Sequence, residues 1–312
     1  IATYNLENFN SLFDVKRSRK VANEIVNQLK SPEILVLQEI MDDDGSQDTD
    51  LVSAERNLAG LVRDIVNASK GKTVYQALNI DPQRNSDGGK TGGNIRTVIL
   101  FSTARGLRLV DGVAGTATEE TELINEKGRA ILSLNPGRIW PGNSAFFGSR
   151  KPIVAQFVFN GQDLYIIGGH FNSKGEDGPL FGDQQPPDTP SERQRVAQAK
   201  AVNGFARDIL EINPDALILV LGDLNDFPWS RSMRTLEGGL LENLTFFLPE
   251  NEWFTYLHEG NGQVLDQMLA SGKLAGRLRN YQIIHLNSLS LPNDASSDHD
   301  PVVAIFDLSA IQ

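Results

Sequence analysis

Apolar and polar residues alternate along the chain in blocks that predict strands interleaved with helices. Short, nearly all-apolar runs at 34–37 and 216–221 have the length and composition of buried strands. Between such runs, Val21, Ile25 and Leu29 recur at a spacing of four residues, which places them on one face of a helix. The pattern therefore predicts an α/β fold with buried strands.

The expected strands lie at 1–6, 34–40, 95–102, 128–139, 152–170, 216–223, 263–271 and 302–306, and the expected helices at 14–29, 51–69 and 191–212. The stretch 152–170 is predicted to be a hairpin, because Asn160-Gly161 is a dipeptide typical of two-residue turns. Ser191 and Gln194 have the spacing of a capping box that opens the last helix. The Gly- and Pro-rich stretch 174–190 is expected to be a loop.

Composition indicates one globular domain, since the 312 residues are 40% hydrophobic and 22% charged. No internal repeat or linker divides the sequence, so we expect residues 1–312 to form a single compact domain with at least two sheets. The sequence begins with IATYNLENF, within what looks like a strand, and we expect it to be trimmed from a longer protein. The apolar runs are too short to predict a membrane span.

The net charge of -11, from 29 basic and 40 acidic residues, gives a field that does not attract nucleic acid. A polyanionic substrate would therefore have to be held locally, by a metal ion or a few arginines. The absence of cysteine excludes a disulfide framework and a thiol nucleophile.

Polar side chains recur at the ends of the apolar strands. These residues are Asn5, Gln38, Glu39, His170, Asn172, Asp223, Asn225, Asp266, Asp298 and His299. A cap or turn role explains any one of them, because Asn and Asp are common at such positions. The same residue types at six strand ends together favour a shared site.

Metal binding is the chemistry that these oxygen-rich strand ends suit. A hard cation such as Mg²⁺ binds through one or two carboxylates, keeps several waters and also contacts the substrate phosphate. Glu39 and Asp298 are the leading ligand candidates, with Asn5 as a neutral amide ligand. Only four histidines and no cysteine argue against a zinc site.

The C-terminal stretch SSDHDPVVAIF places a histidine between two aspartates at the start of a strand. A histidine with a carboxylate neighbour can act as a general base, because the carboxylate fixes its tautomer and stabilises its charged form. His299 with Asp266 would form that pair if the fold brings them together.

Four further residues are candidates for contacts with the reacting phosphate. His170 is expected to donate to a phosphate oxygen, together with Asn172. Asp223 and Asn225 project from one side of an extended chain. We expect Asp223 to align the attacking water and Asn225 to hold a phosphoryl oxygen or the metal.

Two arginine positions precede apolar strands. Arginine makes bidentate contacts with phosphate, so Arg96 in GGNIRTVILF is a candidate phosphate clamp. A surface arginine beside a Gly-rich turn explains it equally well. Arg150, before PIVAQF, is a weaker candidate of the same kind.

Other polar and aromatic signals leave alternatives open. The acidic loop 42–50 is either a Ca²⁺ site or a solvated loop, and the second is favoured because its spacing differs from an EF-hand. Phe227 and Trp229 either line a groove and stack on a base, or pack at a helix start, which is favoured. His258 and His285 are interpreted as structural.

With these residues in view, the chain resembles the endonuclease/exonuclease/phosphatase superfamily, whose members share the deoxyribonuclease-I-like fold. The motifs that carry the resemblance are NLENF, LVLQEI, GGHFNSKG, LGDLNDFP, VLDQMLAS and SDHDPVV, in the expected order over nearly the whole chain. The resemblance implies a four-layer α/β (α+β) sandwich, in which two mixed sheets pack face to face with helices outside. It also implies hydrolysis of a phosphoester by in-line attack of water, dependent on Mg²⁺ or Mn²⁺, with His299 and Asp266 handling a proton.

Within this superfamily, the stretches GGNIRTVILF and TYLHEGNGQVLDQMLAS are similar to bacterial extracellular nucleases. The leading hypothesis is a secreted or cell-surface endonuclease that cleaves DNA, with RNA as a further candidate substrate and no obligate protein partner. Deoxyribonuclease itself pairs its first catalytic histidine with a glutamate that has no evident match here, which leaves the partner of His170 open.

Two other functions remain as alternatives. One is a phosphatase or phosphodiesterase acting on a small or lipid-derived phosphoester, such as an inositol phosphate. The other is a binding or adhesion module that kept the fold without activity, which the intact set of motif residues disfavours.

Overall fold

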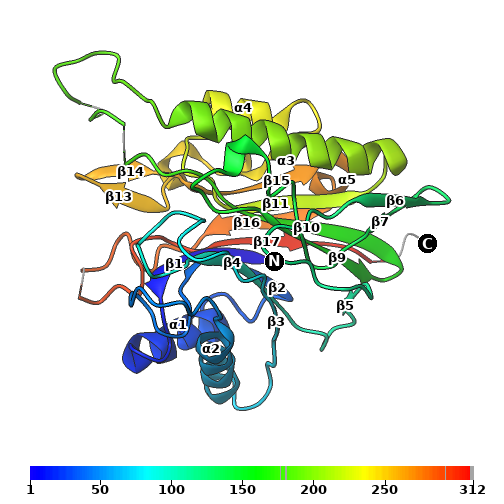
Figure 1. The fold of residues 1–312 in the computed structure, drawn as a ribbon, viewed down its shortest axis with the longest axis horizontal. Helices are drawn as coiled ribbons and strands as arrows, with labels where there is room; N and C mark the ends of the chain where they lie inside the picture. Colours follow the sequence, from blue (N-terminus) through cyan, green and yellow to red (C-terminus); the bar gives the residue numbers. More distant parts are fainter. Residues whose placement is uncertain (176, 180, 292, 310–312) are drawn as a thin grey trace.

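The computed structural model describes residues 1–175, 177–179, 181–291 and 293–309, and shows two β-sheets packed face to face (Figure 1). Helices α1 (Val15–Asn27) and α2 (Glu55–Ala68) cover the outer face of one sheet. Helices α3 (Glu192–Ile212) and α4 (Arg231–Glu237) cover the outer face of the other. This four-layer arrangement confirms the α/β sandwich predicted from the sequence.

The first sheet has the strand order β16-β17-β1-β2-β4-β3. Its strands are β1 (Ala2–Phe9), β2 (Ile34–Ile40), β3 (Gln76–Leu78), β4 (Arg96–Phe101), β16 (Leu278–Ile283) and β17 (Val302–Phe306). Strands β1 and β2 run parallel and the other neighbours pair antiparallel, so the sheet is mixed. The parallel pair places Asn5 opposite Gln38, and the chain leaves β2 one residue after Glu39.

The second sheet has the order β12-β15-β11-β10-β9-β5, with β8 paired to β9. Its strands are β5 (Arg108–Leu109), β8 (Gly137–Arg138), β9 (Ile153–Phe159), β10 (Gln162–His170), β11 (Leu217–Asp223), β12 (Leu241–Asn243) and β15 (Asp266–Ser271). Parallel pairing of β10 and β11 places His170 opposite Asp223. Antiparallel pairing of β11 and β15 places Asp266 opposite Asp223 from the other side. The register alone thus brings three candidate residues together.

The smaller elements are hairpins and short helices. They are β6 (Leu123–Glu126), β7 (Arg129–Leu132), β13 (Tyr256–His258), β14 (Asn261–Gln263), α5 (Gly272–Ala275) and the 3₁₀ turns η1 (Ser144–Phe146), η2 (Leu244–Phe247) and η3 (Glu250–Glu252). The hairpin of β9 and β10 turns at Asn160-Gly161, both with positive φ, as the sequence predicted. Within the described part of the chain, none of the helices has the length and apolar character needed to cross a membrane.

The predicted capping box at the start of α3 is wrong. Ser191 itself has helical backbone angles, and its hydroxyl donates to Asp177 at 2.6 Å. The Gln194 side chain donates instead to the carbonyls of Ala145 and Phe147. Tertiary partners have taken both side chains, so α3 begins without the local cap.

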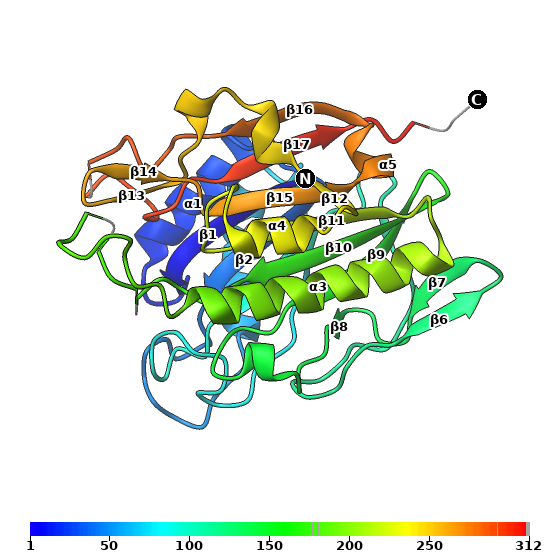
Figure 2. The ribbon, with the colours of Figure 1, turned by 90° about the horizontal axis from the view of Figure 1, so that it is seen from above.

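The core forms three apolar layers, and the strand pattern explains how. In β11, Leu217, Leu219 and Leu221 face the opposite sheet, whereas Ile218 and Val220 face α3 and α4. Because successive side chains of a strand point to opposite faces, an all-apolar strand supplies both layers at once. The view from above shows α3 lying across the second sheet (Figure 2).

Candidate active site

A cleft of about 770 Å³ opens where the ends of strands from both sheets meet. Its lining includes Glu39 from β2, His170 and Asp223 from neighbouring strands of the second sheet, and Asp298 with His299 before β17. Residues that are far apart in the sequence therefore share one cavity. Of the predicted strand-end residues, Asn5, Gln38, Asn172 and Asp266 are not among those that line it.

Two of the site residues predicted from the sequence, Glu39 and Asn225, have a strained backbone. Glu39 has φ 60° beside an irregularity in the pairing of β2, and Asn225 has φ 52° just after β11. Non-glycine residues rarely adopt positive φ, and each such position costs on the order of 1–3 kcal/mol. The surrounding structure holds both residues in this conformation, which is typical of functional sites.

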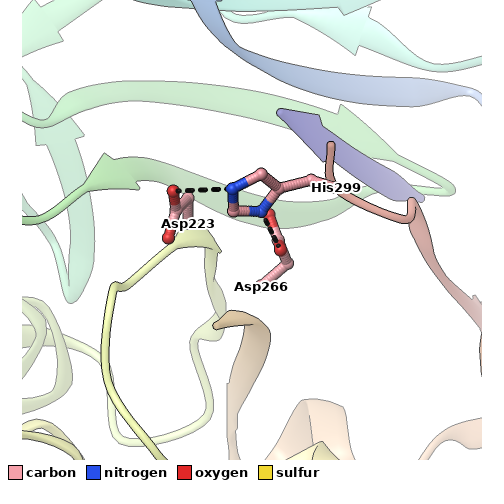
Figure 3. A group of neighbouring side chains, drawn as sticks. All are labelled: Asp223, Asp266 and His299. Atoms are coloured by element: carbon pink, nitrogen blue, oxygen red, sulfur yellow. Dashed lines mark hydrogen bonds and ion pairs between the residues drawn. The ribbon is translucent and has the colours of Figure 1, made fainter. Parts of the chain in front are cut away.

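His299 and Asp266 form a buried pair. The His299 Nδ1 lies 2.7 Å from Asp266 Oδ2, and its Nε2 faces Asp223 Oδ2 at 3.9 Å (Figure 3). Burial alone would lower the pKa of His299, but the carboxylates of Asp266 and Asp223 outweigh it and raise the pKa well above its usual value. The sequence predicted a contact between His299 and Asp266, and the structure contains it.

Asp223 joins the two sheets at the centre of the site. Its Oδ2 accepts a hydrogen bond from Asn5 Nδ2 at 3.0 Å, and its Oδ1 accepts one from the Asn225 backbone N–H at 3.0 Å. Burial raises the pKa of Asp223 to about 7, with His299 acting against the rise and Asp266 adding to it. A carboxylate with this pKa can exchange a proton at neutral pH.

His170 stands beside Asp223 as a neutral imidazole. Its Nε2 lies 3.5 Å from Asp223 Oδ2 and 3.9 Å from Glu39 Oε1. Burial, assisted by the nearby charge of Arg150, lowers the pKa of His170 well below its usual value. Its Nδ1 is buried without a hydrogen-bond partner among the described residues, so the partner of this nitrogen, which the sequence left open, is not found there either.

The mouth of the cleft carries acidic groups that suit a divalent cation. Glu39 accepts hydrogen bonds from Asn5 Nδ2 and from the Asn8 backbone, and Asp298 is partly exposed to the cleft. Burial, then the negative charges of Asp298 and Glu39, raise the pKa of Glu7, and Arg17 acts against the rise. Hard oxygen donors with unbalanced negative charge match the requirements of a metal such as Mg²⁺, so the residues fit the group.

A second group of potential ligands lies deeper. Ligand atoms of Asp223, Asp266 and His299 lie within 4.8 Å of one another. We interpret this trio as an acid–base group, because the Asp266–His299 hydrogen bond already occupies His299 Nδ1. The structure therefore offers a candidate metal site among the acidic groups at the mouth and a candidate acid–base group among the more deeply buried residues.

The prediction that Arg96 binds a phosphate is wrong, because the side chain lies elsewhere and is already paired. Arg96 lies outside the cleft, is 2% exposed and pairs with Asp81 at 2.5 Å, and its other nitrogens donate to the Asn94 carbonyl. The side chain that the sequence placed near a phosphate is instead fully used in holding the start of β4.

Arg150, the weaker candidate, lines the cleft. It is 6% exposed, and its Nη2 donates to the Phe171 carbonyl at 2.6 Å. Among the described residues it has no carboxylate within ion-pair distance and its Nε has no acceptor. A buried guanidinium with unused donors is a natural receptor for a phosphate oxygen.

The remaining candidates are divided. The backbone N–H of Asn172 donates to Gln198 on α3, and Asn172 lies outside the cleft lining, so no contact supports its predicted role. Phe227 lines the cleft, with Lys174 4.6 Å from its ring centroid, and stacks on Trp229. Groove lining and packing therefore both apply to Phe227.

Two histidines and a tyrosine complete the surroundings. His258 is exposed on the β13–β14 hairpin and lines the cleft, which corrects its structural interpretation. His285 binds Asp300 and is structural as expected. Tyr256, which the sequence pattern did not single out, bridges His299 through the backbone and lies over its ring at 4.8 Å. The one sequence feature that could have pointed to Tyr256 is its place in the hairpin directly before β15, the strand that carries Asp266.

A family model described as the Endonuclease/Exonuclease/phosphatase family matches residues 2–299. Among curated protein sequences, none matches the chain significantly.

Solved structures share the fold at low identity. Truncated TDP2 from Caenorhabditis elegans has a TM-score of 0.58 at 17% identity, covering 96% of this chain and 94% of that one. A D. rerio TDP2 complexed with single strand DNA product has a TM-score of 0.58 at 16% identity, covering 98% and 97%. A Bacteroides thetaiotaomicron mannosyl-6-phosphatase has a TM-score of 0.56 at 14% identity, covering 98% of each chain. At these identities the similarity shows the fold alone.

Proposed function

The chain belongs to the endonuclease/exonuclease/phosphatase family, and from this premise we propose that it is a divalent-metal-dependent endonuclease that cleaves DNA. The family supports phosphoester hydrolysis; the polynucleotide substrate is the step that we add. RNA is a further candidate substrate, and the secreted or cell-surface location stays a prediction from the sequence.

The observation that carries the proposal is the extent of the cleft. At about 770 Å³ it has room for far more than one phosphoryl group, and Lys90 and Phe227 line it beyond the candidate catalytic residues. Lys174 lines it too and pairs with Asp226 at 2.6 Å. Cations and aromatic rings along a groove are the features that hold the backbone and bases of a nucleic-acid strand. The fold is also that of a TDP2 solved with a single strand DNA product.

Glu39 and Asp298, with Asn5, would hold the metal. When bound, a divalent ion stabilises the negative charge that develops on the phosphoryl oxygens. It would also offset the mutual repulsion of the acidic groups at the mouth of the cleft. We propose Mg²⁺ as the working ion, with Mn²⁺ as a substitute, because the ligands are carboxylate and amide oxygens.

Proton transfer would fall to the deeper group. Asp223, with a pKa of about 7, can accept a proton from the attacking water. His299, held in its charged form by Asp266, can donate a proton to the leaving oxygen through Nε2, because Nδ1 is bound to Asp266 and His299 lines the cleft. Asp266 keeps the imidazole in one orientation and stabilises its charge.

Arg150 and His170 would bind the phosphoryl oxygens. Arg150 has unused donors at the cleft, and the neutral His170 presents Nε2 beside Asp223. Asn225 Nδ2 donates to the same Phe171 carbonyl that binds Arg150, so one carbonyl positions both side chains.

A plasmid-nicking assay tests the proposal. Supercoiled DNA would be incubated with the protein and Mg²⁺, with and without EDTA, beside mannose 6-phosphate, inositol phosphates and a chromogenic phosphodiester. Nicking that requires the metal supports the endonuclease. Turnover of the phosphomonoesters with intact plasmid would replace it with a small-substrate phosphatase, the activity named for one protein of the same fold.

The two arginines give a matched prediction. Arg150→Met is expected to raise KM for DNA by about 10- to 100-fold, because it removes charge-assisted hydrogen bonds to phosphate. Arg96→Met should lower the melting temperature, because Asp81 loses its partner, and should leave KM unchanged. Steady-state kinetics and thermal unfolding separate the two. If Arg96→Met raises KM more than Arg150→Met does, Arg96 and not Arg150 is the arginine that contacts the phosphate.

A further inference from the structure

The acidic loop 42–50 packs tightly against the glycine-rich loop that borders the cleft. A side-chain carbon on Gly92 would lie 2.8–2.9 Å from the backbone of residues 47–48, so the two loops touch without space for one. The neighbouring Gly89 and Lys90 line the cleft. A shift of the acidic loop would therefore move the glycine-rich loop that forms one edge of the cleft.

Most carboxylates of this loop are accounted for. Asp43 accepts hydrogen bonds from the backbone of Arg56 and Asn57 at the start of α2. Asp48 pairs with Arg84 at 2.9 Å, and the Asp50 side chain is 98% exposed. For these residues the solvated or capping roles are sufficient.

Asp42 and Asp44 are different. Asp42 is 0% exposed; its Oδ2 accepts from Asn94 Nδ2 at 2.7 Å, but its Oδ1 has no hydrogen-bond partner among the described residues. Asp44 Oδ2 accepts from the Thr49 hydroxyl, and its Oδ1 is likewise buried without a described partner. A buried carboxylate oxygen without a donor carries its full desolvation penalty.

The two carboxyl groups also act on each other. Burial raises the pKa of Asp42 to about 6, and contact with Asp44 adds to the rise, while Asn94 and Arg96 oppose it. Arg96 is already paired with Asp81. A cation beside the two carboxylates would supply a partner for Asp42 Oδ1 and for Asp44 Oδ1, the two buried oxygens that lack a described hydrogen-bond donor.

We propose that Asp42 and Asp44 bind a Ca²⁺ ion that fixes the acidic loop against the edge of the cleft, separately from the catalytic metal. Ca²⁺ suits the place because it accepts irregular sets of carboxylate, carbonyl and water oxygens. The carbonyls of Leu51 and Gly92 lie within 3.3 Å of Asn94 Nδ2, which itself contacts Asp42, so the surroundings are rich in oxygen. Residues 46–50, which follow Asp44 in the same loop, are exposed.

The test is thermal unfolding of the full chain with Ca²⁺ alone, without Mg²⁺ or substrate. At pH 7.5 and about 100 times the dissociation constant, Ca²⁺ is expected to raise the melting temperature by about 5 °C. Asp44→Asn should lose this shift, whereas Asp50→Asn, which changes an exposed carboxylate of the same loop, should keep it. Glu39→Gln should also keep it, because it alters only the catalytic metal site.

The pattern of the variants decides the outcome. A shift that persists in Asp44→Asn and vanishes in Glu39→Gln would assign Ca²⁺ to the catalytic cleft and overturn the proposal. No shift in the unaltered chain would leave a shared proton between Asp42 and Asp44 as the explanation, and would overturn it too.

Discussion

Replacing His299 with glutamine is expected to lower kcat for DNA cleavage by about 10²- to 10⁴-fold, the usual contribution of a general acid or base. The glutamine amide can still donate to Asp266, which is buried at 0% exposure, so the pair of side chains keeps its hydrogen bond. What it loses is the transferable proton. Steady-state kinetics at saturating DNA, with circular dichroism to verify the fold, measures the effect.

The pH profile makes this prediction specific. In the proposed reaction the charged His299 donates the proton, so kcat should fall as the pH rises through the raised pKa of His299, and this alkaline limb should disappear in the glutamine variant. Asp266→Asn removes a carboxylate that raises that pKa, so it should move the limb to lower pH. A loss of less than tenfold in His299→Gln, with the limb unchanged, would assign the proton transfer to another group.

Replacing Glu39 with glutamine is expected to reduce activity at low Mg²⁺ by on the order of 100-fold, since metal stabilisation of the transition state amounts to several kcal/mol. The amide oxygen can keep the hydrogen bond from the Asn8 backbone, so the change is mainly the loss of one negative ligand charge. Activity should recover in part at high Mg²⁺. A Mg²⁺ titration of the initial rate measures both effects.

Glu242→Gln is the matched control for Glu39→Gln. Glu242 is exposed on β12, outside the cleft, and its variant should follow the titration curve of the unaltered protein. If Glu39→Gln also follows that curve, the metal is held elsewhere, and the deeper group of Asp223, Asp266 and His299 becomes the candidate site.

Local patterns predicted the strands well because their cause is local. The run at 34–37 is apolar on both faces, and β2 begins with those same residues between two apolar layers. Helix α2 was expected at 51 but begins at Glu55. The N–H groups of its second and third residues donate to Asp43, twelve residues earlier than Glu55, and no local pattern shows such a contact.

The candidate site shows the same limit. His299 and Asp266 were recognisable from their types and strand-end positions, and the register of β11 and β15 brings Asp266 and Asp223 face to face. Arg96 and Arg150 could not be ranked correctly, because both precede an apolar strand. Only the tertiary partner, Asp81 for Arg96, tells a structural arginine from one that is free to bind a ligand.

The hydrogen bond from Asn5 to Asp223 joins side chains that belong to opposite sheets. The relative positions of the site residues therefore depend on how the two sheets are aligned with each other. Misplacement of reacting groups by about 1 Å can cost 100-fold in rate. The shape of the apolar layer between the sheets, formed by side chains such as Val36 and Leu219, thus bears on the reaction rate as well as on stability. A substitution there can slow the enzyme without touching a polar residue.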